Sequence, residues 1–219
     1  MENKHRVSET YRSALNSFKR FRHGKNLRID DLTDSMIESY ETWLIQNGLK
    51  RNTIGFYMRV LRAIYNRAVK QGLVIQTHPF EKVYARVDKT IKRAIKEQDI
   101  RQLKQTKGLK EEESFARDIF LLSFYLRGIS FIDLAYLKKS DLKNGQLTYY
   151  RRKTRQRIVI GWCPCMQQII DRWSDQSSPY MLPILSNNNG NTRAQYLKAL
   201  QATNKHLKEI GNRLRLHVP

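Results

Sequence analysis

Two segments contain the residue types that could bind or act on an anion. Five of the seven residues from Arg151 to Arg157 are Lys or Arg, and strand-forming residues flank this run on both sides. A hairpin would carry the run outward at its tip, where five like charges repel one another unless an anion arrives. A solvated loop is the alternative, but a DNA backbone would satisfy these charges.

The second segment begins where Arg127 and Gly128 follow an apolar helical pattern. A guanidinium buried at this point needs an anion, and Asp133 is the nearest candidate. A structural pair between Arg127 and Asp133 is the conservative interpretation, since such pairs also bury arginines. The alternative is that both residues belong to a catalytic site.

The charge of the whole chain points to a polyanionic partner. Among 219 residues, 41 are Lys or Arg and 20 are Asp or Glu, which gives a net charge of +21. Residues 1–90 carry 17 basic and 9 acidic residues, and residues 91–219 carry 24 and 11. Because both halves are basic, both can face the same polymer, and nucleic acid is the leading candidate. An acidic membrane would favour one basic amphipathic helix or a terminal tract instead.

Several kinds of chemistry are excluded by the motifs that the sequence lacks. The glycines are too widely spaced for a phosphate-cradling loop, and neither a His-Glu-x-x-His nor a Gly-x-Ser-x-Gly motif occurs. Cys163 and Cys165 have no second cysteine pair, which argues against both a zinc site and a disulfide framework. We therefore expect no metal, no cofactor and a cytoplasmic location. No apolar run approaches the roughly 20 residues that span a bilayer, so we expect no membrane association.

Apolar periodicity predicts two domains. Helical spacing covers residues 11–21, 36–45 and 54–68, with Thr33 or Asp34 capping the second helix and Asn52 or Thr53 the third. Residues 85–96 are charged and aperiodic and are predicted to be a linker between domains 1–84 and 97–219. The second domain is predicted to contain helices at 96–104, 111–126, 164–173 and 192–211, and strands at 146–151 and 157–160.

Three motifs, in this order, resemble the tyrosine recombinases, or phage-type integrases, and especially those of mobile elements from Bacteroides-like bacteria. The residues Arg51-Asn52-Thr53-Ile54, with Leu61–Ala68, are similar to the core-binding domain. Ala135–Leu142 is similar to the start of the catalytic domain, and Arg152-Lys153-Thr154 to the hairpin that bears a catalytic lysine. The resemblance implies a mainly α (α+β) fold, with a helical core-binding (SAM-like) domain and a partial catalytic domain that contains a β hairpin.

The resemblance also implies a mechanism without metal or other cofactor. The family cleaves DNA with a tyrosine, forms a 3′-phosphotyrosine and rejoins the strands from that covalent intermediate. Cationic side chains stabilise the charge of the transition state, and a general acid protonates the leaving oxygen. Lys153 matches the hairpin lysine and Asp133 the acid after the first arginine. The usual position of that arginine holds Ser130, and Arg127, about one helical turn earlier, is expected to supply the guanidinium instead.

A larger departure from the family concerns the residues expected after position 219. The family's His-x-x-Arg motif and its nucleophilic tyrosine have no match here, so we expect the chain to be truncated before them. Whether the chain is an enzyme is therefore uncertain, and we expect it to bind DNA without cleaving it. The first interpretation is an integrase of a mobile element. The alternative is a non-catalytic DNA-binding accessory or regulator derived from one, and an RNA-binding protein ranks last.

Double-stranded DNA is the expected partner, held between the two domains by basic helix faces and by the hairpin tip. The family acts as a homo-tetramer on DNA, whereas this fragment is expected to be monomeric and, in a bacterial cell, nucleoid-associated. For the helix residues, a solvated face is an equally weighted alternative. The expected DNA-binding residues are Arg51, Asn52, Thr53, Tyr57, Arg59, Arg62, Arg151, Arg152 and Arg155.

Overall fold

The chain folds into two compact units. The computed structural model describes residues 2–89, 94–186 and 191–216. The first unit comprises Met1–Ile91 and the second Lys92–Pro219. Four residues of the predicted linker, 90–93, lie outside the described residues, as do 187–190 and 217–219. No described helix has the length and apolar character needed to cross a membrane.

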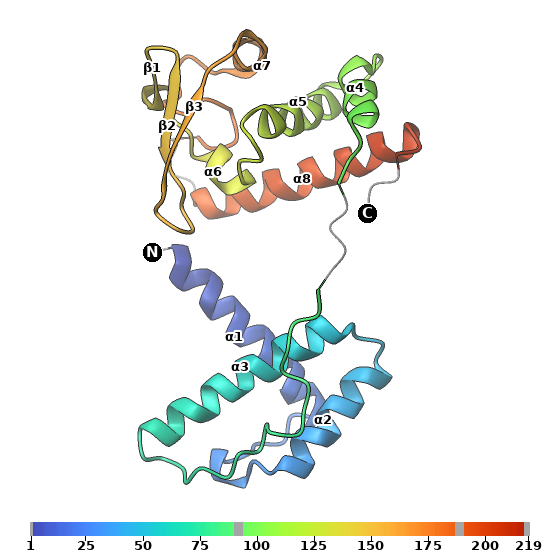
Figure 1. Ribbon diagram of the computed structural model, residues 1–219, viewed down its shortest axis with the longest axis vertical. Helices are drawn as coiled ribbons and strands as arrows, with labels where there is room; N and C mark the ends of the chain where they lie inside the picture. Colours follow the sequence, from blue (N-terminus) through green and yellow to red (C-terminus); the bar gives the residue numbers. More distant parts are fainter. Residues whose placement is uncertain (1, 90–93, 187–190, 217–219) are drawn as a thin grey trace. The chain divides into compact units, whose positions relative to one another are not determined.

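Three helices build the first unit: α1 (Glu2–Phe21), α2 (Asp34–Gln46) and α3 (Arg51–Lys70) (Figure 1). The short 3-10 turn η1 (Ile29–Asp31) precedes α2. The Thr33 hydroxyl caps α2 by accepting a hydrogen bond from the Met36 amide, which settles the predicted choice between Thr33 and Asp34. The prediction for α3 is wrong, because that helix begins at Arg51 and its N-cap is Lys50 rather than Asn52 or Thr53.

The core of the first unit is aromatic and aliphatic, with its largest buried side chains on α2 and α3. Tyr40 is fully buried and donates a hydrogen bond to the Ser17 hydroxyl at 2.8 Å. This burial raises the pKa of Tyr40 to about 12. The irregular segment after α3 adds Phe80 and Val83 to the same core. The segment that contains Phe80 and Val83 is therefore part of the folded unit.

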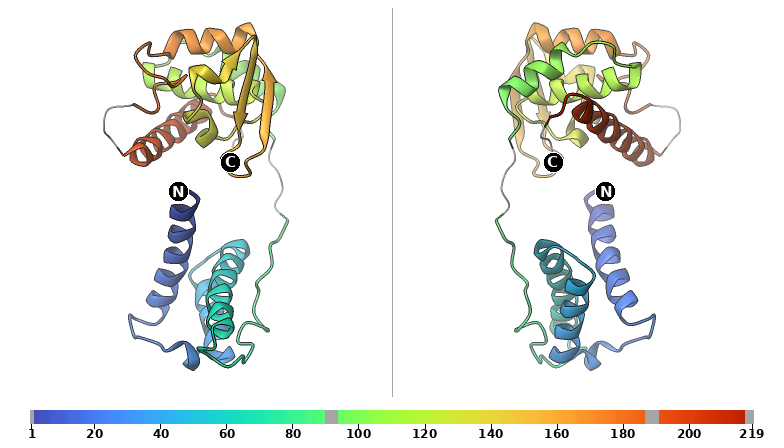
Figure 2. Two further views of the ribbon diagram at one scale, coloured as in Figure 1. Left: turned by 90° about the vertical axis from the view of Figure 1, so that its left-hand side faces the viewer. Right: turned by 90° about the vertical axis from the view of Figure 1, so that its right-hand side faces the viewer.

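The second unit contains α4 (Glu97–Gln105), α5 (Glu111–Tyr125), α6 (Phe131–Ala135), α7 (Pro164–Trp173) and α8 (Thr192–Arg213). All views place α5 between α7 and α8 (Figures 1 and 2). Two carboxylates reinforce this layering. Buried Asp118 of α5 accepts from the Arg172 guanidinium at 2.7 Å and from the Trp173 indole at 2.8 Å, and Glu113 accepts from Arg213 of α8 at 2.5 Å.

A three-stranded antiparallel sheet completes the second unit, in the order β1 (Leu142–Lys143), β2 (Gln146–Tyr150) and β3 (Arg157–Gly161). It follows the 3-10 turn η2 (Lys139–Asp141). The predicted hairpin is the β2–β3 pair, with Tyr150 opposite Arg157 at the end that joins the loop. Strand β1 was not predicted, because two residues are too few to show alternation. The turn at Asn144-Gly145 joins β1 to β2, and both residues have positive φ, 49° and 70°.

Candidate nucleic-acid interface

The tip of the β2–β3 hairpin projects the basic run from the sheet. Two main-chain hydrogen bonds close the tip: the Arg151 amide donates to the Gln156 carbonyl at 2.8 Å, and the Arg155 amide donates to the Arg151 carbonyl at 2.7 Å. The side chains of Arg151, Lys153 and Arg155 are exposed. The main chain thus spaces these cations along a closed loop, where they can face a polyanion.

Asp133 connects the hairpin to α6. Its carboxylate is buried and accepts a hydrogen bond from the Arg152 amide at 2.9 Å through Oδ1, and from the Ser130 hydroxyl at 2.6 Å through Oδ2. Ser130 is also the N-cap of α6, where its oxygen accepts from the Asp133 amide. The Arg152 guanidinium lies over the Tyr136 ring, 3.8 Å from its centroid. Both the main chain and the side chain that precede Lys153 are therefore held by the α6 region.

Asp133 also affects a neighbouring residue of the sheet. Burial raises the pKa of Tyr149 on β2, and the negative charge of Asp133 adds to this shift. The structure thus brings together three residues that the sequence singled out: Asp133, Ser130 and Arg152, which is next to Lys153.

The environment of Arg127 differs from the one predicted from the sequence. Its side chain is exposed rather than buried, and the carboxylate of Asp133 is bonded to Ser130 and Arg152. The interpretation of a buried structural pair between Arg127 and Asp133 is therefore wrong. Arg127 adopts φ 56° at the end of α5, and Gly128 follows with φ 78° and donates to the Ser123 carbonyl. This is a left-handed helix end, which turns the arginine outward.

The six candidate residues on α3 fall into two groups. Arg51 and Arg62 are exposed, and Thr53 and Tyr57 are half-buried. Asn52 and Arg59 instead bind the chain's own main chain. The Arg59 guanidinium donates to the carbonyls of Ala85 at 3.2 Å and Arg86 at 2.8 Å. Whatever else they contact, these two side chains have an intramolecular role that the sequence did not indicate.

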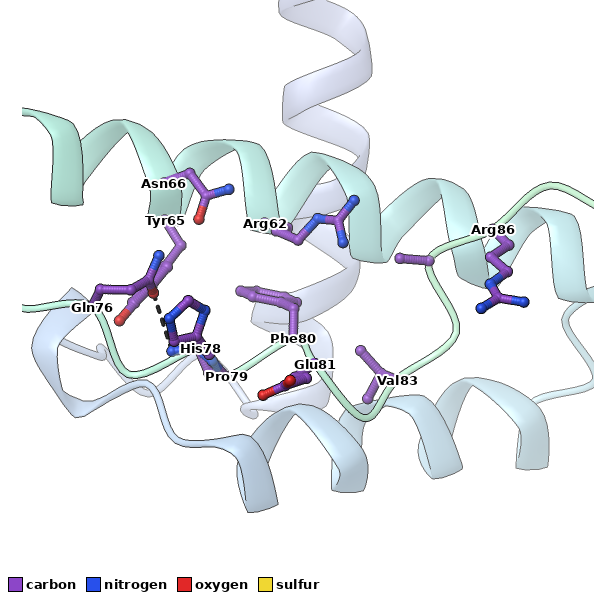
Figure 3. Close-up of a pocket in the computed structure, with 11 residues that line it drawn as sticks. Arg62, Tyr65, Asn66, Gln76, His78, Pro79, Phe80, Glu81, Val83 and Arg86 are labelled. Atoms are coloured by element: carbon purple, nitrogen blue, oxygen red, sulfur yellow. Dashed lines mark hydrogen bonds between the residues drawn. The ribbon is translucent and has the colours of Figure 1, made fainter.

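A pocket of about 610 Å³ lies beside α3, between this helix and the segment that follows it. Figure 3 shows Arg62 on the helix with the Phe80 ring below it, and Arg86 farther along the segment. Gln76, at the other end of the pocket, accepts a hydrogen bond from the His78 amide at 3.1 Å. Arg86 was missed by the sequence analysis, because it lies in the aperiodic stretch that was interpreted as linker.

The two cysteines lie at the start of α7, where Cys163 is the N-cap and Cys165 is in the first turn. Both are free and half-buried. A hydrogen bond with Cys165 lowers the pKa of the Cys163 thiol, whereas burial raises the pKa of Cys165. Within the described ranges, no group of three His, Cys, Asp or Glu residues is placed to hold a metal ion.

Comparison with known proteins identifies the first unit. The sequence profile of the phage integrase SAM-like domain matches residues 1–86. Tyrosine recombinase XerD of Pseudomonas aeruginosa is 20% identical over 162 residues, which cover 70% of this chain and 54% of XerD. The chain thus spans about half the length of this curated relative.

Two solved structures share the fold over 91% and 90% of the chain. A lambda integrase dimer bound to a COC′ core site gives a TM-score of 0.63 at 17% identity, and covers 91% of this chain and 58% of that one. The Tn1549 transposon integrase in complex with transposon right end DNA gives 0.64 at 16% identity, with 90% and 73% covered. The predicted fold, a helical core-binding (SAM-like) domain and a catalytic-domain region with a β hairpin, is confirmed.

These matches agree on one architecture. The architecture is that of integrases, with a SAM-like domain followed by a mainly helical domain with a small sheet. Residues 1–86 match the phage integrase SAM-like domain, and the chain is similar to a tyrosine recombinase over 162 residues.

Proposed function

We propose that the chain binds duplex DNA and is part of a site-specific recombinase of a mobile element, which cleaves and rejoins strands through a 3′-phosphotyrosine. The observation that carries the proposal is the anchored basic hairpin, in which Asp133 holds the main chain next to Lys153. Relatives of the same fold have been solved with DNA, among them the lambda and Tn1549 integrases. A net charge of +21, spread over both units, supports the same partner.

In the complete protein, Lys153 would act as the general acid. Its ammonium would donate a proton to the 5′ oxygen as this oxygen leaves phosphorus, which prevents the build-up of an alkoxide. Asp133 would not touch the substrate, because its two carboxylate oxygens are bonded to Ser130 and Arg152. It would instead position the hairpin. Arg127, exposed at the end of α5, would supply the guanidinium that matches two phosphoryl oxygens.

The proposed DNA contacts come from both units. On α3 they are Arg51, Thr53, Tyr57 and Arg62, and at the hairpin Arg151, Arg152 and Arg155. The complete protein would act as a homo-tetramer on DNA in the bacterial cytoplasm, associated with the nucleoid, while the chain itself would be monomeric in solution. Within each unit the candidate side chains lie on one helix or one hairpin tip.

A salt titration tests the proposal. Fluorescence anisotropy with labelled mixed-sequence duplex DNA should give a logarithm of the association constant that falls linearly with the logarithm of salt concentration, because each phosphate contact releases counterions. Lys153→Ala should reduce the steepness of that slope by about 1. Lys104→Ala, at an exposed position of α4, is the matched control and should leave the slope unchanged. An affinity independent of salt would contradict the proposal.

The second candidate function is a non-catalytic DNA-binding accessory or regulator derived from an integrase. Ser130 favours it, since its hydroxyl occupies the position of the usual first arginine and is bonded to Asp133. Incubating the complete protein with a nicked duplex that traps covalent intermediates separates the two functions. A protein–DNA adduct that withstands denaturing electrophoresis supports the recombinase. Salt-dependent binding without an adduct supports the accessory.

A further inference from the structure

A segment of the first unit, Tyr84–Asp88, is seated on α3 by contacts to its main chain. The Asn52 side chain uses both ends of its amide: Nδ2 donates to the Asp88 carbonyl at 3.2 Å, and Oδ1 accepts from the Asp88 amide at 2.7 Å. Arg59 binds the carbonyls of Ala85 and Arg86. Four main-chain groups of the segment are therefore satisfied by two side chains of one helix.

Gly55 makes this seat possible. It is buried in the second turn of α3, inside the helix, where glycine costs about 1 kcal/mol relative to alanine. A Cβ at this position would collide with the Arg86 carbonyl oxygen and lie 3.1 Å from the Tyr84 ring. The glycine thus has a packing role, which is to let the main chain of the segment approach the helix closely.

Side-chain contacts also hold the Tyr84–Asp88 segment on α3. The Arg51 guanidinium lies over the Tyr84 ring, 4.4 Å from its centroid, and the Tyr84 hydroxyl donates to the Asp88 carboxylate at 2.6 Å. The Tyr84 amide donates to Glu41 of α2 at 2.9 Å. Because contacts come from α2 and α3, the segment has a defined path across the unit.

The charge of the segment indicates which role this path serves. A segment that blocked DNA from binding to α3 would be expected to be acidic. Residues 84–89 carry Arg86, Asp88 and Lys89 instead, and their net charge is positive. Arg86 and Lys89 are exposed. A fixed path would present these cations to a phosphate backbone without the entropy cost of ordering a free chain on binding.

We propose that Asn52, Gly55 and Arg59 are positioning residues that hold the Tyr84–Asp88 segment on α3, so that Arg86 and Lys89 contact DNA from a fixed path. The inference rests on the proposed function, since it assumes that DNA is the partner. It replaces direct DNA contact as the main role of Asn52 and Arg59. It also extends the DNA-binding surface to Arg86, which forms one wall of the pocket in Figure 3.

Gly55→Ala is the variant that separates positioning from contact. Glycine has no side chain to lose from DNA, and alanine favours the helix, so α3 should stay folded while the segment is displaced. Gly161→Ala is the matched control, because nothing lies within 4 Å of a Cβ built there. We expect about fivefold weaker binding to mixed-sequence duplex DNA for Gly55→Ala, because the displaced main chain that carries Arg86 and Lys89 must then be ordered on binding. Gly161→Ala should bind like the unmodified chain.

Hydrogen exchange provides the second readout. The Asp88 amide is bonded to Asn52, so its exchange in the unmodified chain should be slow and should stay slow when DNA is bound. Gly55→Ala should exchange fast at this amide. If the amide lost protection when DNA bound, or if Gly55→Ala bound DNA as well or better, the positioning role would be refuted. If the unmodified chain did not bind DNA, the proposed function would fail, while exchange in the free chain would still test the seat itself.

Discussion

Replacing Asp118 by alanine should destabilise the second unit far more than any surface change. Its carboxylate is 2% exposed and accepts hydrogen bonds from Arg117, Arg172 and Trp173, at 2.9, 2.7 and 2.8 Å. These bonds join α5 to α7 on one side of the core. Removing the carboxylate leaves a nearly buried Arg117 guanidinium without its anion, and it also opens a small cavity.

The expected magnitude follows from these contacts. Removing one partner of a buried ion pair costs about 3–5 kcal/mol. Arg172 is 54% exposed at its side chain and can turn to water, so its share is small. We therefore expect a loss of about 3 kcal/mol, which is a large part of the roughly 5–15 kcal/mol that stabilises a domain. At a typical slope of about 2 kcal/mol per molar urea, the midpoint should fall by about 1.5 M.

Tryptophan fluorescence can assign the loss to one unit. Trp173 is bonded to Asp118, whereas Trp43 packs against Phe21 and Tyr40 in the other unit. A Trp43→Phe background would report on the second unit, and Trp162→Phe with Trp173→Phe on the first. The control is Arg101→Ala, whose pair with Glu97 is exposed at both side chains and should contribute at most about 0.5 kcal/mol. A midpoint shift below about 0.5 M, or an equal shift in the first unit, would refute this reasoning.

Two further predictions concern the hairpin anchor and the acid stability. Asp133→Ala should leave the Arg152 amide without its partner, lower the free energy of unfolding by about 1–3 kcal/mol and speed hydrogen exchange at the hairpin tip. The control Lys153→Ala should change neither stability nor exchange. Unchanged exchange in Asp133→Ala would show that the tip is not anchored by Asp133. The Lys110 amide, and secondarily Arg213, lower the pKa of Glu113 in the folded chain. Its stabilising effect is therefore present above the unfolded pKa and is lost as pH falls through the folded one. Thermal melts between about pH 5 and pH 2 should show a shallower loss of stability in Glu113→Gln than in the unmodified chain, and parallel curves would contradict the assignment.

The helices and the hairpin could be predicted because their signals are local. Apolar spacing outlined every helix given above except α6, whose five residues are too few to show a helical period, and the strand-forming runs on either side of Arg151–Arg157 gave β2 and β3. The error at Arg127 was also local. The residue lies among apolar neighbours, but Gly128 directly after it is the signal of a left-handed helix end, where the preceding side chain points outward.

The roles of Asn52 and Arg59 could not be predicted in the same way. Both lie on a polar helix face, and such a face shows no sign of what covers it. Their partners are 26 to 36 residues away, in irregular main chain without periodicity. The only local indication was Gly55, since a glycine inside a helical pattern indicates close approach of another main chain. No prediction was based on Gly55.

The hydrogen bond between the hairpin and Asp133 is donated by the main-chain amide of residue 152. Every amino acid except proline offers that amide, so this hydrogen bond places almost no restriction on which residue stands there. A change at position 152 would lose the guanidinium contact with Tyr136 but keep the main-chain bond. The basic tip can therefore diversify, by natural variation or by grafting, while the hairpin stays attached to α6.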